Sequence, residues 1–265
     1  MRKQNKLIVG LLFLTVVALA SCTEKQSMTS GDNSSDHYST QSSAEELVET
    51  TLSKVDQPSS SKEEETMHYE AGALLQAVAA GDLEKVQLII GDSDYQIDEV
   101  NDKEETPLLI AVHNNQIEIA EKLMAAGADI NQQDEIQDSP YLYAGAQGRT
   151  EILKYMLENE EPNQAVVNRF GGNALIPAAE KGHLENVKLL LADGRSAINH
   201  QNNYGYTALI EAVGLRDGSE VYQQIVAELL KYGADKNLRD NYGKTAADYA
   251  FALGYTQILD LLREE

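Results

Sequence analysis

One short step recurs along this 265-residue chain at intervals of 33, 34, 34 and 38 residues. Each copy has Thr, Ser or Asn ahead of a helix-like run, and an alanine follows five positions later. The steps begin at Thr106, Ser139, Asn173, Thr207 and Thr245, and the alanines are Ala111, Ala144, Ala178, Ala212 and Ala250. A second amphipathic run follows each step. A period of this length predicts an array of stacked repeats rather than one globular core.

The residue types within each copy fit a pair of helices joined by a turn. A Thr or Ser before a helix accepts a hydrogen bond from a free backbone N–H, and Pro107 and Pro140 stand at the first helical position, which tolerates proline. The recurring alanine lets two helices approach closely. Gly127 and Gly233 fall where a helix ends in a left-handed residue. An earlier copy over residues 73–90 has both helical runs without the Thr-Pro step.

The period, the Thr-Pro-Leu step at 106–108 and the Gly-Ala-Asp tags at 127–129 and 233–235 resemble the ankyrin repeat. The resemblance implies an all-α ankyrin-repeat solenoid of about six helix–turn–helix pairs with β-turn fingers, over residues 67–265. The third copy departs from it, because residues 158–163 read ENEEPN in place of the Gly-Ala-Asp tag. The histidine that usually follows Thr-Pro-Leu is also absent, and we expect apolar packing in its place. The positions hold Leu109, Leu142, Ile176, Ile210 and Asp248.

The N-terminus has the layout of a secretory signal. A short basic start precedes 14 apolar residues, 7–20, which as a helix cover about 21 Å and so fall short of the roughly 30 Å hydrocarbon core of a bilayer. Residues 19–22, Leu-Ala-Ser-Cys, resemble the lipobox of bacterial lipoproteins. This resemblance implies cleavage between Ser21 and Cys22 and a covalent diacylglycerol on the Cys22 sulfur, joined in some bacteria by a fatty acyl chain such as palmitate on its amine.

We therefore expect a lipoprotein signal peptide over residues 1–21 and a lipid-anchored, flexible tether over residues 22–66. Seventeen of the 44 residues from 23 to 66 are Ser or Thr, a composition that does not bury enough apolar surface to fold. A short helix over residues 43–55 is an open alternative. So is an ordinary signal peptide with a chance cysteine. Cys22 is the only cysteine, so disulfides within the chain are impossible.

The anchor predicts a cell-membrane protein on the extracytoplasmic face, at a bacterial surface or in a periplasm, that contacts the membrane only through its lipid. The formal net charge is −22, and removal of the three basic residues of the leader makes it −25. Such a surface argues against a nucleic-acid partner, which requires a basic face, and favours a basic protein partner or cations.

The sequence offers no catalytic or cofactor motif. It lacks a nucleophile elbow, a zinc-protease helix and a glycine-rich phosphate loop, and Cys22 is committed to lipidation. We predict no enzyme activity, no cofactor and no metal site. The acidic stretch over residues 92–105 is interpreted as a solvated loop, with docking of a basic partner as the alternative. His183 is expected to have a structural role.

Recognition is expected on the concave face that ankyrin proteins form from their fingers and first helices. The finger tips carry Ile136, Phe170, Tyr204 and Tyr242 after a leading Lys103, and Tyr206 lies two residues beyond Tyr204. Aromatic anchors are favoured at interfaces, but the same residues can serve only to support the turns. First-helix residues expected on the same face are His113, Asn114, Gln147, Glu180 and Lys181.

These features predict a monomeric, membrane-anchored scaffold or adaptor that binds another protein without catalysis. The alternative is a protective or immunity-type protein that captures a toxin or stabilises an enzyme outside the cytoplasm.

Overall fold

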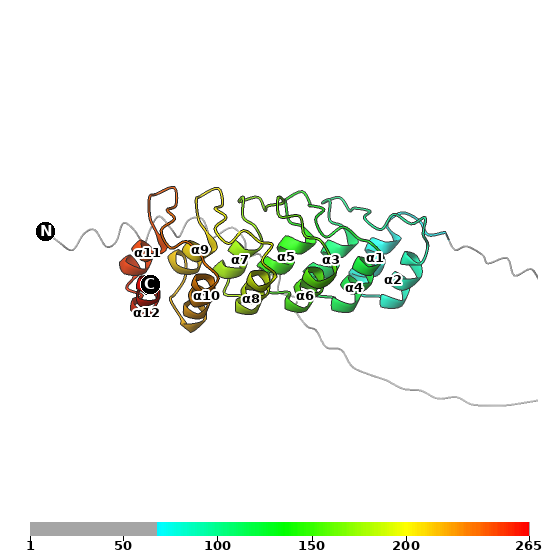
Figure 1. Cartoon of the computed structure of the whole chain (residues 1–265). Coiled ribbons are helices and arrows are strands. Elements are labelled where there is room, and N and C mark those ends of the chain that lie inside the picture. The colour runs from blue at the N-terminus through cyan, green and yellow to red at the C-terminus, as the bar shows by residue number, and fades with distance from the viewer. Residues whose placement is uncertain (1–67, 265) are drawn as a thin grey trace, which may run out of the picture. The chain divides into compact units, whose positions relative to one another are not determined.

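The computed structural model describes residues 68–264, and within this range the chain forms twelve α-helices and no β-strand (Figure 1). The helices form six pairs: α1 (Ala73–Ala80) with α2 (Leu83–Ile90), α3 (Pro107–His113) with α4 (Ile117–Ala125), α5 (Pro140–Ala146) with α6 (Thr150–Asn159), α7 (Leu175–Glu180) with α8 (Leu184–Asp193), α9 (Ala208–Gly214) with α10 (Glu220–Lys231), and α11 (Ala246–Leu253) with α12 (Thr256–Arg263). The expected all-α solenoid of about six repeats is confirmed. The predicted leader, lipidation site and tether lie outside the described residues.

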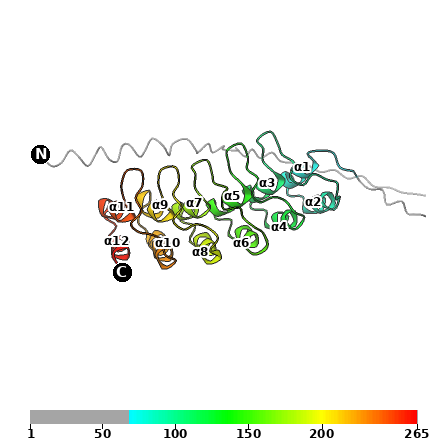
Figure 2. The ribbon, with the colours of Figure 1, turned by 45° about the horizontal axis from the view of Figure 1, so that its top comes forward.

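The pairs stack in two layers of helices. Each odd-numbered helix contacts the next odd-numbered one, and α2, α4, α6, α8, α10 and α12 contact one another in the same order. The loops between successive pairs project as fingers beside the odd-numbered layer (Figures 1 and 2). Side chains on these fingers and on the odd-numbered helices can therefore share one face.

The first helices begin where the recurring step predicts. The hydroxyl oxygens of Thr106, Ser139, Thr207 and Thr245 each accept a hydrogen bond from the backbone N–H three residues later, at 3.1–3.2 Å. In α7 the Asn173 side chain makes the equivalent contact with the Ile176 N–H at 3.3 Å. A cap of this kind stabilises a helix by about 1 kcal/mol. Each capping step therefore fixes the start of its helix.

The core is continuous along the array. The five recurring alanines have no exposed surface, as expected for positions where two helices meet. The apolar residues that replace the usual histidine, Leu109, Leu142, Ile176 and Ile210, are at most 4% exposed. Apolar packing in place of that histidine is thus confirmed. In the last repeat Asp248 occupies the position and closes a capping box with Thr245.

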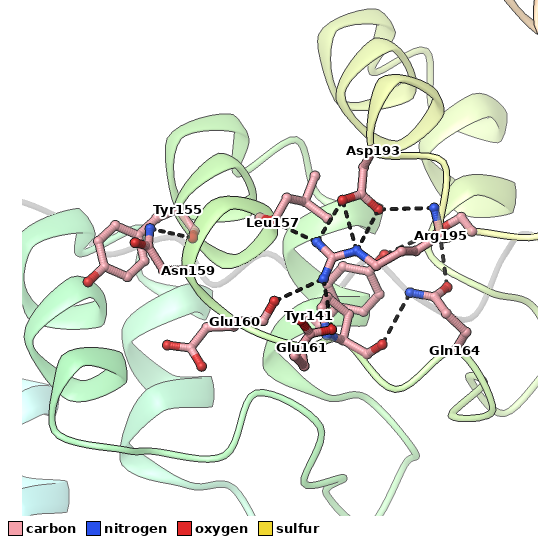
Figure 3. A network of polar contacts seen from close by, with 11 residues as sticks. Tyr141, Tyr155, Leu157, Asn159, Glu160, Glu161, Gln164, Asp193 and Arg195 are labelled. Atoms are coloured by element: carbon pink, nitrogen blue, oxygen red, sulfur yellow. Dashed lines mark hydrogen bonds and ion pairs between the residues drawn. The ribbon is translucent and has the colours of Figure 1, made fainter.

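The second helices α4, α8 and α10 end at a left-handed glycine, whereas Gly91 after α2 has φ of −73°. Gly127 and Gly233 have φ of 93° and 88°, in the left-handed region that favours glycine. The end of α6 is instead closed by a side chain from the following repeat (Figure 3). The Arg195 guanidinium donates to the carbonyl oxygens of Leu157 at 2.7 Å and Glu160 at 3.0 Å. It is held in place by Asp193, whose carboxylate lies 2.6 Å from Nη2 of Arg195.

The acidic stretch over residues 92–105 is more than a solvated loop, and that interpretation is wrong in part. Glu99 accepts hydrogen bonds from the backbone N–H of Gly72 at 2.6 Å and of Leu75 at 3.1 Å. It thereby caps α1, whose own N-cap residue is a glycine without a side chain. Asp98 likewise accepts from the Asp129 N–H at 3.0 Å. Glu99 therefore stabilises the first repeat, and Asp98 joins the first repeat to the second.

Candidate functional site

Each finger is closed by an Asn or Asp side chain. Its Oδ1 accepts the backbone N–H groups two and four residues later, at 2.8–3.0 Å, which makes an Asx turn. The residues are Asn101, Asp134, Asn168, Asn202 and Asp240. Sequence reasoning missed these turns. The signal was an Asn or Asp five residues before each of the five caps at the recurring step.

The fingers are also bonded to one another. The N–H of Glu135 donates to the carbonyl oxygen of Lys103, that of Asn203 to Phe170, and that of Asn241 to Tyr204, at 2.9–3.1 Å. The carbonyl groups at three of the predicted finger tips are therefore satisfied by the next finger. These bonds fix the spacing of the fingers that they join, and the fingers stand side by side along the array (Figure 2).

The tip side chains are open to solvent. Ile136, Phe170, Tyr204 and Tyr242 are 44%, 46%, 46% and 69% exposed. Lys103 is exposed as well. The turns are already closed by the Asx contacts and the backbone bonds, so these large apolar side chains are not needed to fill the turn. We call the four residues the finger row.

Tyr206 is an exception among the predicted contact residues. It is only 8% exposed, so its placement on an open binding surface is wrong. Its ring stacks on Tyr204 with centroids 6.1 Å apart and meets the edge of Tyr249 at 6.4 Å. Tyr206 thus packs between Tyr204 on the finger and Tyr249 on α11, and it joins the finger to that helix.

The predicted first-helix residues differ in accessibility. Asn114 and Lys181 are exposed, whereas His113, Gln147 and Glu180 are half-buried. The His113 ring packs 4.1 Å from the Tyr143 ring, and its Nδ1 lies 3.4 Å from Oε1 of Glu105. Burial lowers the pKa of His113 against the opposing effect of Glu105. His113 therefore acts mainly as a packing residue at the edge of this face.

Charged groups of both signs lie between the fingers and the first helices. Although Lys181 is exposed as a residue, partial desolvation of its side chain by neighbouring groups lowers its pKa, and the carboxylates of Glu180 and Asp138 oppose that shift. Burial, with Asp134 nearby, raises the pKa of Asp138. Glu180 makes a 2.5 Å ion pair with Nη2 of Arg216. The structure thus brings Glu180 and Lys181 together with Asp138 and Arg216, two residues that the sequence did not single out.

Glu211 on α9 is the most unusual charged residue of this face, and sequence reasoning missed it. It is 5% exposed, and burial together with the Glu180 charge raises the pKa of its carboxyl to about 7. The equivalent positions of the other first helices hold Gln76, Ile110, Tyr143, Pro177 and Tyr249. A lone carboxylate at a position that is otherwise uncharged was the signal in the sequence.

The remaining histidines of the repeats make structural contacts. The His183 ring occupies the space beside Gly148, where an added Cβ would lie 2.7 Å from Nδ1. His200 Nε2 lies 2.6 Å from the carbonyl oxygen of Gly171. Among residues 68–264 no group of three or more His, Cys, Asp or Glu side chains could hold a metal ion.

Comparison with protein families gives a direct match. The family model "Ankyrin repeats (3 copies)" matches residues 37–134, 74–166 and 142–240, which together span most of the chain. The chain belongs to the ankyrin-repeat family. Ankyrin repeats are generally non-catalytic modules that mediate protein–protein binding.

Similar proteins are found among curated sequences and solved structures. The putative ankyrin repeat protein YahD of Escherichia coli K12 is 37% identical over 188 residues, which is 71% of this chain and 92% of YahD. The crystal structure of the ankyrin repeat protein EF0377 is 60% identical, with a TM-score of 0.74 over 74% of this chain and 99% of that one. An ankyrin repeat domain from Acinetobacter baumannii AYE is 46% identical, with a TM-score of 0.70 over 73% of this chain and 97% of that one.

The described part of this ankyrin-repeat chain contains no helix that is long and apolar enough to cross a membrane.

Proposed function

We propose that this ankyrin-repeat protein is a lipid-anchored, extracytoplasmic scaffold or adaptor that binds a protein partner, without catalysis, through the finger row. The observation that carries the proposal is the exposure of Ile136, Phe170, Tyr204 and Tyr242 on turns that are already closed by other contacts. Large side chains on turns whose backbone is already fixed provide contact area at low entropic cost. They are therefore suited to anchor a partner.

Anchorage rests on the sequence of the N-terminus. Lipid on Cys22, followed by a Ser/Thr-rich tether, would confine the repeats near a membrane and raise their effective concentration for partners held there. The negative net charge of the chain favours a partner with a basic surface.

The binding half of the proposal is tested by crosslinking on intact membranes followed by quantitative pull-down. The test variant combines Phe170→Ala, Tyr204→Ala and Tyr242→Ala. The matched control combines Leu88→Ala, Tyr232→Ala and Phe251→Ala, which remove side chains of 58%, 44% and 74% exposure that lie off the finger row. We expect the captured partner to be lost from the test variant and kept by the control. Equal capture by both variants would show that the finger row does not bind.

The anchoring half is tested with Cys22→Ser. Loss of the acceptor sulfur should leave an unlipidated chain that is uncleaved or partitions into the aqueous phase during detergent phase separation. Labelling with a clickable palmitate analogue reads the lipid directly and should be absent in the variant. Normal cleavage with unchanged membrane partitioning would contradict the lipoprotein assignment. This result would leave the binding half of the proposal intact.

A further inference from the structure

The last repeat exposes a bulky apolar side chain at a position that every earlier repeat buries. Phe251 on α11 is 74% exposed. The equivalent side chains of four earlier first helices have no exposed surface: Val78, Val112, Ala179 and Val213. In the third repeat the position holds Gly145, where an added Cβ would lie 2.9 Å from Cβ of Ala174 in the following repeat. The position therefore faces the next repeat, and α11 belongs to the last repeat that the structure describes.

Two other positions of the last repeat show the same loss of cover. Leu259 on α12 is half-buried, whereas its equivalents have no exposed surface: Val86, Ala120, Leu153, Val187 and Val226. Ala247, one turn before Phe251, is also half-buried, and its equivalents are at most 3% exposed: Leu74, Leu108, Tyr141, Leu175 and Leu209. We call Ala247, Phe251 and Leu259 the end face. It belongs to α11 and α12, at the opposite end of the array from α1 and α2 (Figure 1).

An apolar end face is unusual for a terminal repeat. The outer face of such a repeat is normally polar, because no further repeat covers it. Arg263 follows this rule at the position where α4 has the buried Met124. Asp248 follows it as well, where the second to fifth repeats have buried Leu or Ile. Phe251 does not, and an exposed aromatic ring gains free energy when another surface buries it. The end face is therefore suited to contact another molecule.

The distribution of charge favours a second copy of this chain as that molecule. Residues 235–265, which include the last finger, α11 and α12, carry six acidic and four basic side chains, a formal net charge of −2. Residues 68–105, at the other end, carry ten acidic and two basic side chains, a formal net charge of −8. Two copies that meet end face to end face bring their less acidic ends together and keep the more acidic ends apart. A basic partner would instead be attracted to the more acidic end.

The edge of the end face carries exposed charges of both signs. Nη1 of Arg239 lies 3.5 Å from Oδ2 of Asp248, and the two side chains are 61% and 53% exposed. A two-fold axis places the same pair on both sides of an interface. Each cation then meets a surface that also carries an anion, so this edge is complementary to itself.

The chain's own N-terminal part contains another apolar set, Leu47, Leu52 and Val55 in residues 43–55. It joins the array at residue 68, beside α1. Residues 56–67 span at most about 43 Å when fully extended. The five steps from α1 to α11, at 8–10 Å between packed helices, cover about 40–50 Å. Residues 43–55 would reach the end face of the same copy only if the connecting residues were stretched along the whole array.

We propose that a second copy of this chain covers the end face, so that two arrays meet at their C-terminal ends about a two-fold axis. The Phe251 rings of both copies lie in the interface, with Arg239 and Asp248 at its edge. This inference goes beyond the proposed function and does not rest on it, because the end face and the finger row are different surfaces. It also departs from the monomer that the sequence predicts.

The first test is disulfide crosslinking of the full chain, purified in a non-ionic detergent. Cys22 is the only native cysteine, so every variant carries Cys22→Ser, and an introduced cysteine can pair only with its counterpart in another copy. Ala247→Cys places a thiol on the end face, and Ala126→Cys places one on the exposed residue after α4 as the control. After mild oxidation with copper phenanthroline, the reductant-sensitive dimer should be at least tenfold more abundant for Ala247→Cys. Equal amounts from both variants would overturn the inference.

The contribution of the aromatic ring is tested in the Ala247→Cys chain. Phe251→Ser should reduce the crosslinked dimer at least tenfold. Leu88→Ser removes a 58% exposed side chain from α2 at the other end of the array and should leave the dimer unchanged. Both side chains are mostly exposed, so neither substitution should alter unfolding in urea, and this measurement separates loss of the contact from loss of the fold. An unchanged dimer in the Phe251→Ser variant would contradict the proposal.

Sedimentation velocity of the Cys22→Ser chain measures the association without any introduced thiol. An interface built on three apolar side chains lies at the small end of the size range, so we expect a dissociation constant on the order of 100 µM. Association in this experiment without the Ala247→Cys crosslink would mean that the copies meet in another arrangement, and the two-fold contact would be wrong. Leu47→Ser combined with Leu52→Ser should change neither result. A gain or loss of dimer in that variant would show that residues 43–55 occupy the end face instead.

The capture experiment separates this inference from the proposed function. The finger-row triple variant should lose the partner and still form the dimer. The capture control, which includes Phe251→Ala, should lose the dimer and still hold the partner. If the finger-row variant loses the dimer, the copies meet through the fingers and the end-face contact is wrong. If it keeps both the dimer and the partner, the proposed function fails and the end-face contact stands.

Discussion

The Arg195 guanidinium donates a 2.7 Å hydrogen bond to the carbonyl oxygen of Leu157, so the fourth repeat closes the end of the third repeat's second helix. The same guanidinium reaches the Glu160 carbonyl and is oriented by Asp193 (Figure 3). The last carbonyl groups of a helix have no partner within it, and most helices of this array solve the problem with a left-handed glycine. In the third repeat a cation performs that task and at the same time joins two repeats.

Arg195→Ala should lower the free energy of unfolding by about 2 kcal/mol, because two backbone carbonyl groups lose a charged donor in a half-buried site. Denaturation with urea measures the loss, and hydrogen exchange should show faster exchange at the end of α6. The control is Lys154→Ala, which removes a surface ion pair of 3.8 Å from the same helix. It should cost less than about 0.5 kcal/mol. Equal effects of the two substitutions would mean that Arg195 does not support the third repeat.

The repeats and their helix starts could be predicted from the sequence because the determinants are local. A capping hydroxyl at Thr106 acts on an N–H three residues away, and the alanine five positions on is small wherever it lies. The period then implies stacking. The contact of Arg195 with α6 joins residues 38 positions apart, in a copy that had lost its usual tag. Nothing in the local pattern marks such a partner.

The candidate site was predicted only where exposure follows from the turn. Phe170, Tyr204 and Tyr242 are exposed because each sits at the tip of its turn, which the repeat register could locate. The burial of Tyr206 depends on Tyr249 from the next repeat, and Tyr249 also lies beside the buried Glu211. Side-chain accessibility is set by neighbouring repeats, and repeat spacing alone does not give it.

Two fingers hold ordinary residues in a left-handed conformation where later fingers have glycine. Glu104 and Gln137 have φ of 62° and 64°, and the equivalent residues are Gly171, Gly205 and Gly243. A left-handed residue with a Cβ is strained by about 1–2 kcal/mol, and the greater freedom of glycine in the unfolded chain offsets part of the relief. Glu104→Gly and Gln137→Gly should therefore each stabilise the protein by about 0.5–1 kcal/mol in urea denaturation.

Gly205→Ala is the opposite control for these two substitutions. Gly205 has φ of 77°, and an added Cβ would lie 2.8 Å from the backbone nitrogen of Asn241. This atom is the donor of the bond between fingers, so it cannot simply move away. We expect a loss of more than about 1 kcal/mol. If Glu104→Gly and Gln137→Gly destabilise the protein, the left-handed conformation of these fingers is contradicted.

Glu99 should be needed for the order of the first repeat. Glu99→Ala removes the acceptor for the N–H groups of Gly72 and Leu75, and α1 has no side-chain cap of its own. We expect a loss of about 1–2 kcal/mol and faster hydrogen exchange in α1, with α7 to α12 unaffected. Asp94→Ala serves as the control, because Asp94 lies in the same acidic stretch and does not cap α1. If both variants behave as the wild type, the stretch is a solvated loop after all.

Glu211 should make the protein less stable as the pH rises. The pKa of its carboxyl is about 7 in the folded protein and about 4.5 in the unfolded chain, so between these values the native state holds one more proton. Stability then falls with increasing pH, by up to about 3 kcal/mol in total from this group, and the whole loss is present above pH 7. Glu211→Gln should match the wild type near pH 4.5 and exceed its stability most at pH 8. Urea denaturation at pH 5, 6, 7 and 8 measures the difference, with Glu118→Gln as the control. If the wild type and Glu211→Gln give parallel curves, the carboxylate is not desolvated as the structure indicates.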